Sequence, residues 1–416
     1  MYIREVNITN IKSISHFKMT FPEGKEAGWH VLIGDNGAGK SAISKAIAMA
    51  LIGPKDVLRL DPNWESWVRQ GEKKADISIK TVASPKEKEQ TTQLLLEKNE
   101  RNSKFELMNY QASHAEEGKF SYSFTYKKFG AGFGPYRRFT GGNPSSDKEL
   151  GDSPVAPYLT LFKEDILLTA SLAWIKDVYL RSLEKDDKAN QTLEGIKSLV
   201  SASDLLPGKL RIKSISSEGL LFINANGAHI HITDLSDGVK SVLSLTLELI
   251  RLMLTIYDVK EVFGAFSSNR KIDIPGVVIV DEIDAHLHPS WQTRVGQWFT
   301  QHFPRLQFIV TTHSPLVCRA CENGSIWRLA APGTDQESGE ITGDEKNTLI
   351  FGSVLDAYET DIFGSKISRG KEGKNKQKEY RDLVYKEKYG IDMSPKEKEQ
   401  LQHLKKIFHT NVATEE

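Results

Sequence analysis

The sequence has few cysteines, no long apolar run and no excess of either charge. Two cysteines, Cys318 and Cys321, are too few for a disulfide framework and favour a reduced cytoplasmic compartment. No apolar run reaches the ~20 residues that span a bilayer, and no basic-then-apolar leader opens the chain, so we expect no membrane contact and no secretory signal. The 55 basic and 55 acidic residues cancel, which argues against a polyanion binder held by bulk charge.

What the sequence does contain is an alternation of strand-like and helix-like segments. Residues 1–34 alternate apolar and polar positions, as strands joined by turns do, and residues 41–52 are Ala-rich with helical spacing. Two later apolar runs, near 277–280 and 307–312, are typical of buried strands. Residues 83–118 are charged and weakly patterned, so we expect an exposed excursion there. Strands that alternate with helices predict an α/β sheet.

The strongest motif is Gly34-Asp35-Asn36-Gly37-Ala38-Gly39-Lys40-Ser41, which matches G-x-x-x-x-G-K-[ST]. An apolar strand precedes it and a helix follows, which is the context a phosphate-binding loop requires. Its backbone amides can wrap a β-phosphate, the Lys40 side chain can reach the β- and γ-phosphates, and the Ser41 hydroxyl can ligate Mg²⁺. The predicted nucleotide-binding residues in this loop are Asn36, Gly37, Ala38, Gly39, Lys40, Ser41 and Ala42.

Two further strand ends carry groups that suit the same chemistry. Asp281 ends an apolar run and can order the metal, and Glu282 directly after it can act as general base on the attacking water. His313 follows the second apolar strand and can reach a γ-phosphate. We therefore predict Lys40, Glu282 and His313 as catalytic residues and Ser41 and Asp281 as metal ligands.

A second anion-binding stretch, Leu235-Ser236-Asp237-Gly238-Val239-Lys240-Ser241, opens a long apolar helix. Ser236 and Gly238 stand at the helix start, where backbone amides favour anions. The alternative is that Ser236 merely caps the helix.

Together these motifs resemble the ABC-type ATPase superfamily. The match covers Walker A (34–41), signature (235–241), Walker B (277–282), D-loop (284–288) and the H-loop at His313. The resemblance implies an ABC-type P-loop core with a mixed sheet flanked by helices, a helical lid insertion and a short helical C-terminal region. It also implies ATP and Mg²⁺ as cofactors, and a head-to-tail homodimer or higher homo-oligomer in which Ser236 and Gly238 complete the site of the opposite chain.

Within that superfamily, the stretch Asp281-Glu282-Ile283-Asp284-Ala285-His286-Leu287-His288 resembles the branch of RecF, SMC proteins and OLD nucleases. Phe133-Gly134-Pro135-Tyr136-Arg137-Arg138 is similar to ATPases of anti-phage systems such as Septu, PARIS and retrons. The chain lacks the sustained heptads of SMC proteins and the carboxylate pattern of a Toprim nuclease. The resemblance therefore implies an ATPase that controls a separate toxic effector protein, such as a nuclease.

Some features stay open at this stage. No Gln stands where a Q-loop is expected. Two interpretations of the arginines at that place remain: Arg137 or Arg138 faces the phosphate or the lid, or both arginines lie on a solvated turn. We interpret Cys318 and Cys321 as small buried residues. Residues 365–409 carry 13 basic and 7 acidic side chains and include a capping box at 394–397. That tail either packs as a solvated helix, docks an effector or contacts nucleic-acid phosphate.

The sequence thus predicts an ATP-hydrolysing regulator of anti-phage defence. Two alternatives remain: a repair ATPase of RecF type that clamps DNA, and a scaffold that binds ATP without turnover and holds a toxin. The predicted divisions are 1–149 for the first part of the core, 150–233 for the lid, 234–335 for the second part of the core and 336–416 for a basic, partner-docking region.

Overall fold

The structure of the chain is a computed structural model. It describes residues 1–60, 62–83, 87–100, 104–109, 112–113, 128–137, 153–163, 169–201, 206–264, 266, 270–330, 333, 337–360 and 371–407. The chain divides into two compact units, Met1–Gly352 and Ser353–Glu416. The boundary between the two units follows Gly352. The domain boundaries predicted after residues 149, 233 and 335 remain predictions.

A mostly parallel sheet forms the centre of the first unit. Its strand order is β15-β14-β3-β13-β12-β8, and every neighbouring pair is parallel except β14 and β15. The strands are β3 (Gly28–Gly34), β8 (Phe129–Phe133), β12 (Gly276–Val280), β13 (Leu306–Thr312), β14 (Ser325–Leu329) and β15 (Gly339–Ile341). All residues of β12 and β13 are buried, which explains their uninterrupted apolar runs, because a parallel sheet is covered on both faces. The predicted α/β fold class is confirmed.

A second, antiparallel sheet packs beside the first. Its order is β2-β1-β4-β5-β6, with β7 also paired to β5. Its strands are β1 (Tyr2–Ile11), β2 (Ile14–Thr20), β4 (Lys74–Val82), β5 (Gln90–Lys98), β6 (Phe105–Asn109) and β7 (Ala112–Ser113). The expectation of an exposed excursion over 83–118 is therefore wrong for β5 and β6. Leu94 and Leu96 are fully buried on either side of the half-buried Leu95, and the polar residues around these three leucines concealed the strand in the sequence.

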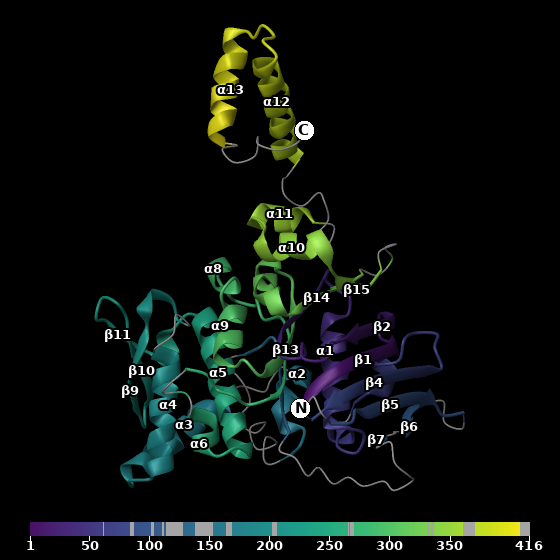
Figure 1. Cartoon of the computed structure of the whole chain (residues 1–416), viewed down its shortest axis with the longest axis vertical. Coiled ribbons are helices and arrows are strands. Elements are labelled where there is room, and N and C mark those ends of the chain that lie inside the picture. Colours follow the sequence, from purple (N-terminus) through teal and green to yellow (C-terminus); the bar gives the residue numbers. More distant parts are fainter. Residues whose placement is uncertain are drawn as a thin grey trace. The chain divides into compact units, whose positions relative to one another are not determined.

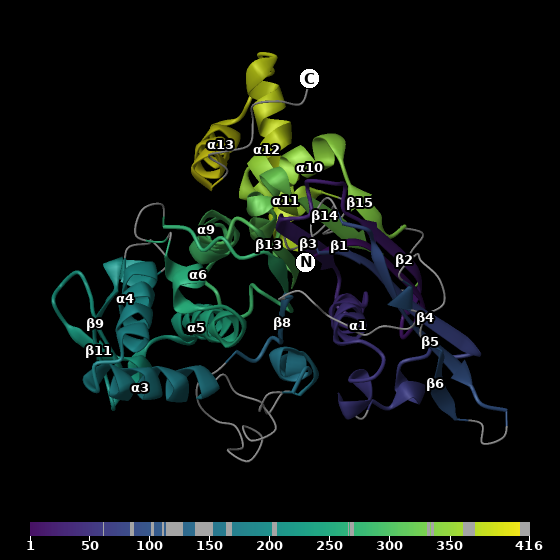
Figure 2. The same cartoon turned by 60° about the horizontal axis from the view of Figure 1, so that its bottom comes forward.

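Helices α1 (Lys40–Ile52) and α5 (Asp237–Ile256) lie on opposite sides of the parallel sheet (Figures 1 and 2). Val277 and Ile279 share a buried cluster with the apolar side of α1, as the alternation of a strand requires. On the other face, Trp29 packs against Phe308 with ring centroids 5.3 Å apart. The two long helices that follow the predicted anion-binding stretches therefore start on different faces of one core.

The remaining helices of the first unit surround this core. The segment predicted as a lid contains helices followed by a small antiparallel sheet, with strand order β11-β10-β9. Its elements are α2 (Leu159–Phe162), α3 (Thr169–Leu183), α4 (Asp187–Ser201), β9 (Arg211–Ser216), β10 (Gly219–Ile223) and β11 (His229–His231). The others are α6 (Val259–Phe263), α8 (Pro289–Gln292), α9 (Val295–His302), the 3₁₀ segment η7 (Pro315–Asn323) and α10 (Gly343–Phe351).

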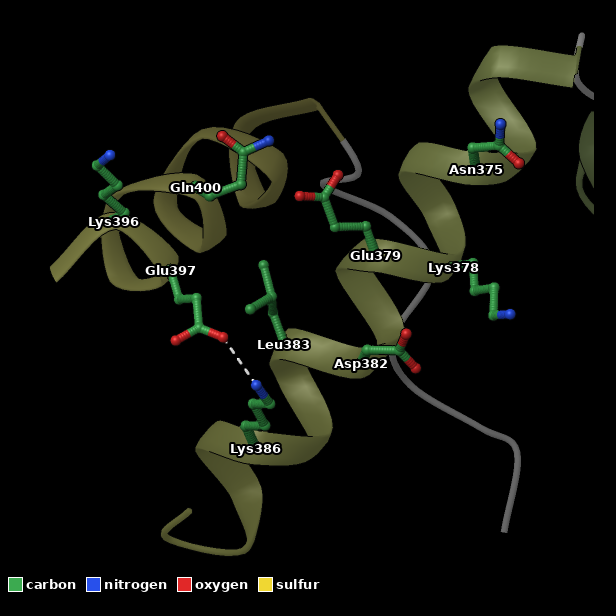
Figure 3. Close-up of a pocket in the computed structure, with 9 residues that line it drawn as sticks. All are labelled: Asn375, Lys378, Glu379, Asp382, Leu383, Lys386, Lys396, Glu397 and Gln400. Carbon is green, nitrogen blue, oxygen red and sulfur yellow. Dashed lines mark hydrogen bonds and ion pairs between the residues drawn. The ribbon is translucent and has the colours of Figure 1, made fainter. Parts of the chain in front are cut away.

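The second unit contains α11 (Val354–Glu359) and a hairpin of α12 (Lys371–Lys388) and α13 (Pro395–Ile407). Leu401 and Leu404 of α13 are buried against α12, and a Lys386–Glu397 ion pair of 2.7 Å joins the two helices (Figure 3). The predicted capping box is confirmed, since Ser394 and Glu397 exchange backbone-to-side-chain hydrogen bonds. No helix in the described part of the chain combines the length and apolar character that a bilayer crossing requires.

Candidate nucleotide-binding site

The loop between β3 and α1 has the geometry of an anion cradle. Gly37 and Gly39 have φ angles of 80° and 101°, in the left-handed region that favours glycine. Gly39 precedes the first residue of α1, and no side chain caps that helix. The amides of its first turn are therefore left to an external acceptor, and such a terminus suits an anion such as a phosphate.

Lys40 lies buried inside this loop, with 5% of its surface exposed. Its Nζ donates to the carbonyl oxygens of Gly34 (2.7 Å) and Asp35 (3.0 Å) and lies 3.4 Å from Nδ1 of His313. Burial lowers the pKa of Lys40, and the nearby carboxylates of Glu282 and Asp281 act in the opposite direction. The structure thus brings three of the predicted catalytic side chains, from three separate segments, to one end of the parallel sheet.

Thr311 of β13 holds the predicted carboxylate pair in place. Its hydroxyl donates to Oδ1 of Asp281 (2.5 Å) and accepts from the backbone N–H of Glu282 (2.8 Å). Asp281 is buried, and Glu282 adopts a φ of 47°, which is rare for a residue with a side chain. Sequence reasoning missed Thr311, whose role follows from the parallel pairing of β12 with β13.

Asp284 and Thr312 position His313 in a similar way. Asp284 accepts hydrogen bonds from the hydroxyl of Thr312 (2.6 Å) and from the backbone N–H of His313 (3.4 Å). Burial, and secondly Lys40, lowers the pKa of His313, so its ring is neutral at pH 7. A neutral imidazole can donate one hydrogen bond to a phosphate oxygen and accept another.

The donor set fits Mg²⁺. A P-loop metal site takes one hydroxyl, one carboxylate and phosphate oxygens and keeps several waters, so it needs no dense cluster of protein ligands. Ser41 at the start of α1 and Asp281 directly after β12 would supply the hydroxyl and the carboxylate. Within the described ranges, no group of three or more His, Cys, Asp or Glu residues forms a separate metal site.

Ser236 and Gly238 lie elsewhere, at the start of α5. Ser236 is exposed, and its side chain makes no capping hydrogen bond, which counts against the simple cap interpretation. A Cβ on Gly238 would lie 2.6 Å from the carbonyl oxygen of His286, so this position must be glycine for the D-loop to pack against α5. In the described part of the chain, no hydrogen bond joins Ser236 or Gly238 to residues 34–42.

Arg137, the first of the two arginines after β8, does not lie on a solvated turn. Arg137 is 3% exposed, and its guanidinium donates to the backbone carbonyls of Asp281 (2.8 Å) and Glu282 (2.9 Å). The Arg137 side chain therefore takes neither of the roles considered from the sequence. It contacts the backbone beneath the carboxylate pair. Arg138 lies outside the described residues.

Cys318 and Cys321 are small buried residues of η7, as predicted. Neither has measurable exposure, and burial raises the pKa of both thiols. They are therefore unreactive thiols at neutral pH.

Comparison with known proteins adds the following. Residues 30–319 match a family described as "AAA domain, putative AbiEii toxin, Type IV TA system". The chain is similar to Septu protein PtuA of Bacillus mycoides, with 26% identity over 78% of this chain and 40% of that protein. It is also similar to the "Retron Ec83 probable ATPase" of Escherichia coli, with 31% identity over 45% of this chain and 32% of that protein. The chain thus spans less than half the length of these two relatives.

Among solved structures, an SMC head bound to the C-winged helix domain of ScpA is similar in outline. The match has a TM-score of 0.48 and 18% identity, and it covers 84% of this chain and 99% of that chain.

Proposed function

Because this chain belongs to the AAA domain family described as "putative AbiEii toxin, Type IV TA system", we propose that it binds and hydrolyses ATP to regulate an anti-phage defence system. The observation that carries the proposal is the meeting of Lys40, Glu282 and His313 around an uncapped helix N-terminus. Membership of an AAA family favours a nucleotide as the anion that binds at this helix N-terminus.

Each of these side chains has a role that its position allows. The loop amides hold the β-phosphate, and the Lys40 ammonium exchanges its carbonyl partners for phosphate oxygens. Ser41 and Asp281 would hold Mg²⁺, which would supply charge stabilisation on the phosphates. Glu282 accepts the proton of the attacking water, and His313 donates a hydrogen bond to the γ-phosphate.

The second half of the site comes from another chain in this proposal. The exposed Ser236 and the amides at the start of α5 face the γ-phosphate held by the opposite chain's loop. Two such contacts related by a twofold axis form a closed head-to-tail pair.

The defence role rests on the names of the relatives, a Septu protein and a retron ATPase. We propose that ATP binding and hydrolysis in the cytoplasm change the pairing of chains and thereby release or restrain a separate effector. The α12–α13 hairpin, rich in lysine, is the proposed docking element for that effector.

Replacing Lys40 with Met tests nucleotide binding directly. We expect ATP affinity to fall about 100-fold, because a buried ammonium is the main positive charge at the phosphates. Equilibrium titration with a fluorescent ATP analogue measures the change. Lys45→Met, which removes a charge from the same helix α1, is the control and should change affinity less than about twofold. Equal affinity for the Lys40→Met variant and the unaltered chain would refute the proposed phosphate site.

A further inference from the structure

Arg137 makes four side-chain hydrogen bonds in the interior of the first unit. Its Nη1 donates to the carbonyl oxygens of Gly134 (2.7 Å) and Asp281 (2.8 Å), and its Nη2 donates to that of Glu282 (2.9 Å). Its Nε donates to the hydroxyl of Ser241 on α5 (3.2 Å). The planar guanidinium therefore bridges the end of β8, the turn after β12 and the second turn of α5.

The turn after β12 needs such support. Glu282 adopts a φ of 47°, a conformation that costs free energy for a residue with a Cβ and persists only where the surroundings fix it. Its N–H donates to Thr311 and its carbonyl oxygen accepts from Arg137, so both backbone groups of this residue are fixed by side chains. The Glu282 carbonyl oxygen also accepts from the backbone N–H of Ala285 (3.0 Å), and these three bonds together fix the turn that carries the Glu282 carboxylate.

The opposite end of the bridge is helix α5. Ser241 is buried at the Arg137 side chain, and the hydroxyl of Ser244, one turn further on, lies 2.9 Å from the carbonyl oxygen of Ser241 and 3.3 Å from that of Arg137. The side chain and the backbone carbonyl of Arg137 thus contact α5 on consecutive turns of the helix. Because α5 begins at Asp237, these contacts set the position of the helix start that carries Ser236 and Gly238.

The charge of Arg137 also suits this place. Burial lowers its pKa to about 10, while Asp281, Asp284 and Glu282 act in the opposite direction, so the guanidinium stays protonated at pH 7. A lysine there would keep the charge but not the flat fork that reaches backbone carbonyls and Ser241 together.

We infer that Arg137 is a positioning residue that mechanically couples the general base Glu282 to the neighbour-facing start of α5. Its bonds make one rigid connection between the chain's own phosphate site and the surface that completes the neighbour's site. This inference rests on the proposed ATPase function and adds to it a route by which the two sites of a pair influence each other.

The experiment compares Arg137→Lys, Ser241→Ala and the double variant with the unaltered chain. Steady-state ATP hydrolysis gives kcat and KM, and light scattering with ATP gives the pairing of chains. We expect kcat to fall about 30-fold for Arg137→Lys and about fivefold for Ser241→Ala, with KM changed less than about threefold. The double variant should match Arg137→Lys, because both changes break the same bridge.

Arg251→Lys is the matched control. Arg251 also lies on α5 and forms a two-bond contact with Glu248, at 2.8 and 2.6 Å, away from the turn after β12. We expect its kcat and KM to stay within about twofold of the unaltered chain.

Two results would overturn the coupling. One is that the losses of the single variants multiply in the double variant. The other is that melting temperature and ATP affinity fall together with kcat in Arg137→Lys, as for an arginine that only stabilises the fold. If the unaltered chain bound ATP without turnover, only the proposed ATPase activity would be contradicted. The coupling would still be testable, because it predicts that ATP-dependent pairing is about tenfold weaker in both single variants.

Discussion

Replacing Glu282 with Gln is expected to lower ATP turnover about a thousandfold while ATP stays bound. The amide has the shape of the carboxylate, and the backbone bonds of residue 282 to Thr311 and Arg137 do not involve its side chain. The fold of the turn is therefore kept, and only proton acceptance from water is lost. Hydrolysis of radiolabelled ATP measures turnover, and nucleotide retained through gel filtration measures trapping.

The same substitution at a glutamate outside the site controls for the loss of one negative charge. Glu322 is exposed at the end of η7, and Glu322→Gln should leave turnover within about twofold. If Glu282→Gln hydrolysed ATP as fast as this control, Glu282 would not be the general base. If the unaltered chain bound ATP and hydrolysed none, the scaffold alternative would replace the enzyme.

Replacing Ser236 with Arg is expected to lower turnover at least about 100-fold without weakening ATP binding to the single chain. Ser236 is exposed at the start of α5 and makes no capping bond, so the larger side chain fits on the isolated chain. It would, however, fill the space where the opposite chain's γ-phosphate must approach. Turnover, ATP titration and light scattering with ATP separate these effects.

Ser217→Arg provides the same substitution at an exposed serine in the turn between β9 and β10. It should leave turnover within about twofold, because it lies away from both predicted anion sites. Loss of activity in the Ser217→Arg variant, or normal turnover in Ser236→Arg, would contradict the assignment of Ser236 to the neighbour's site.

The parts of this site that sequence could predict are those carried by local pattern. The loop from Gly34 to Ser41 has a fixed spacing between strand and helix, and Asp281 and Glu282 end an apolar run. Such signals need no knowledge of distant neighbours. Strand β5 was missed because its three consecutive leucines stand in an otherwise polar segment, so no extended apolar alternation marks it as a strand.

Arg137 and Thr311 could not be assigned because their roles depend on pairing between distant segments. Strand β12 runs between β8 and β13, and this places Arg137 and Thr311 on either side of the turn after Val280. From sequence, the arginines of this Gly/Pro turn are equally compatible with a solvated turn and with a side chain that faces phosphate or lid. Only the sheet order shows that this one is enclosed and bonded to backbone carbonyls.

We propose that each ATP lies between the loop of one chain and the start of α5 of another. Chemical cross-linking tests this directly, because both native cysteines are fully buried and any exposed engineered cysteine is the reactive one. A chain with Asn36→Cys is mixed with a chain with Ser236→Cys, both positions being exposed, and a short thiol cross-linker is added. We predict a two-chain product that forms with a non-hydrolysable ATP analogue and not with ADP. Equal cross-linking with and without that analogue, or none in either case, would contradict the claim.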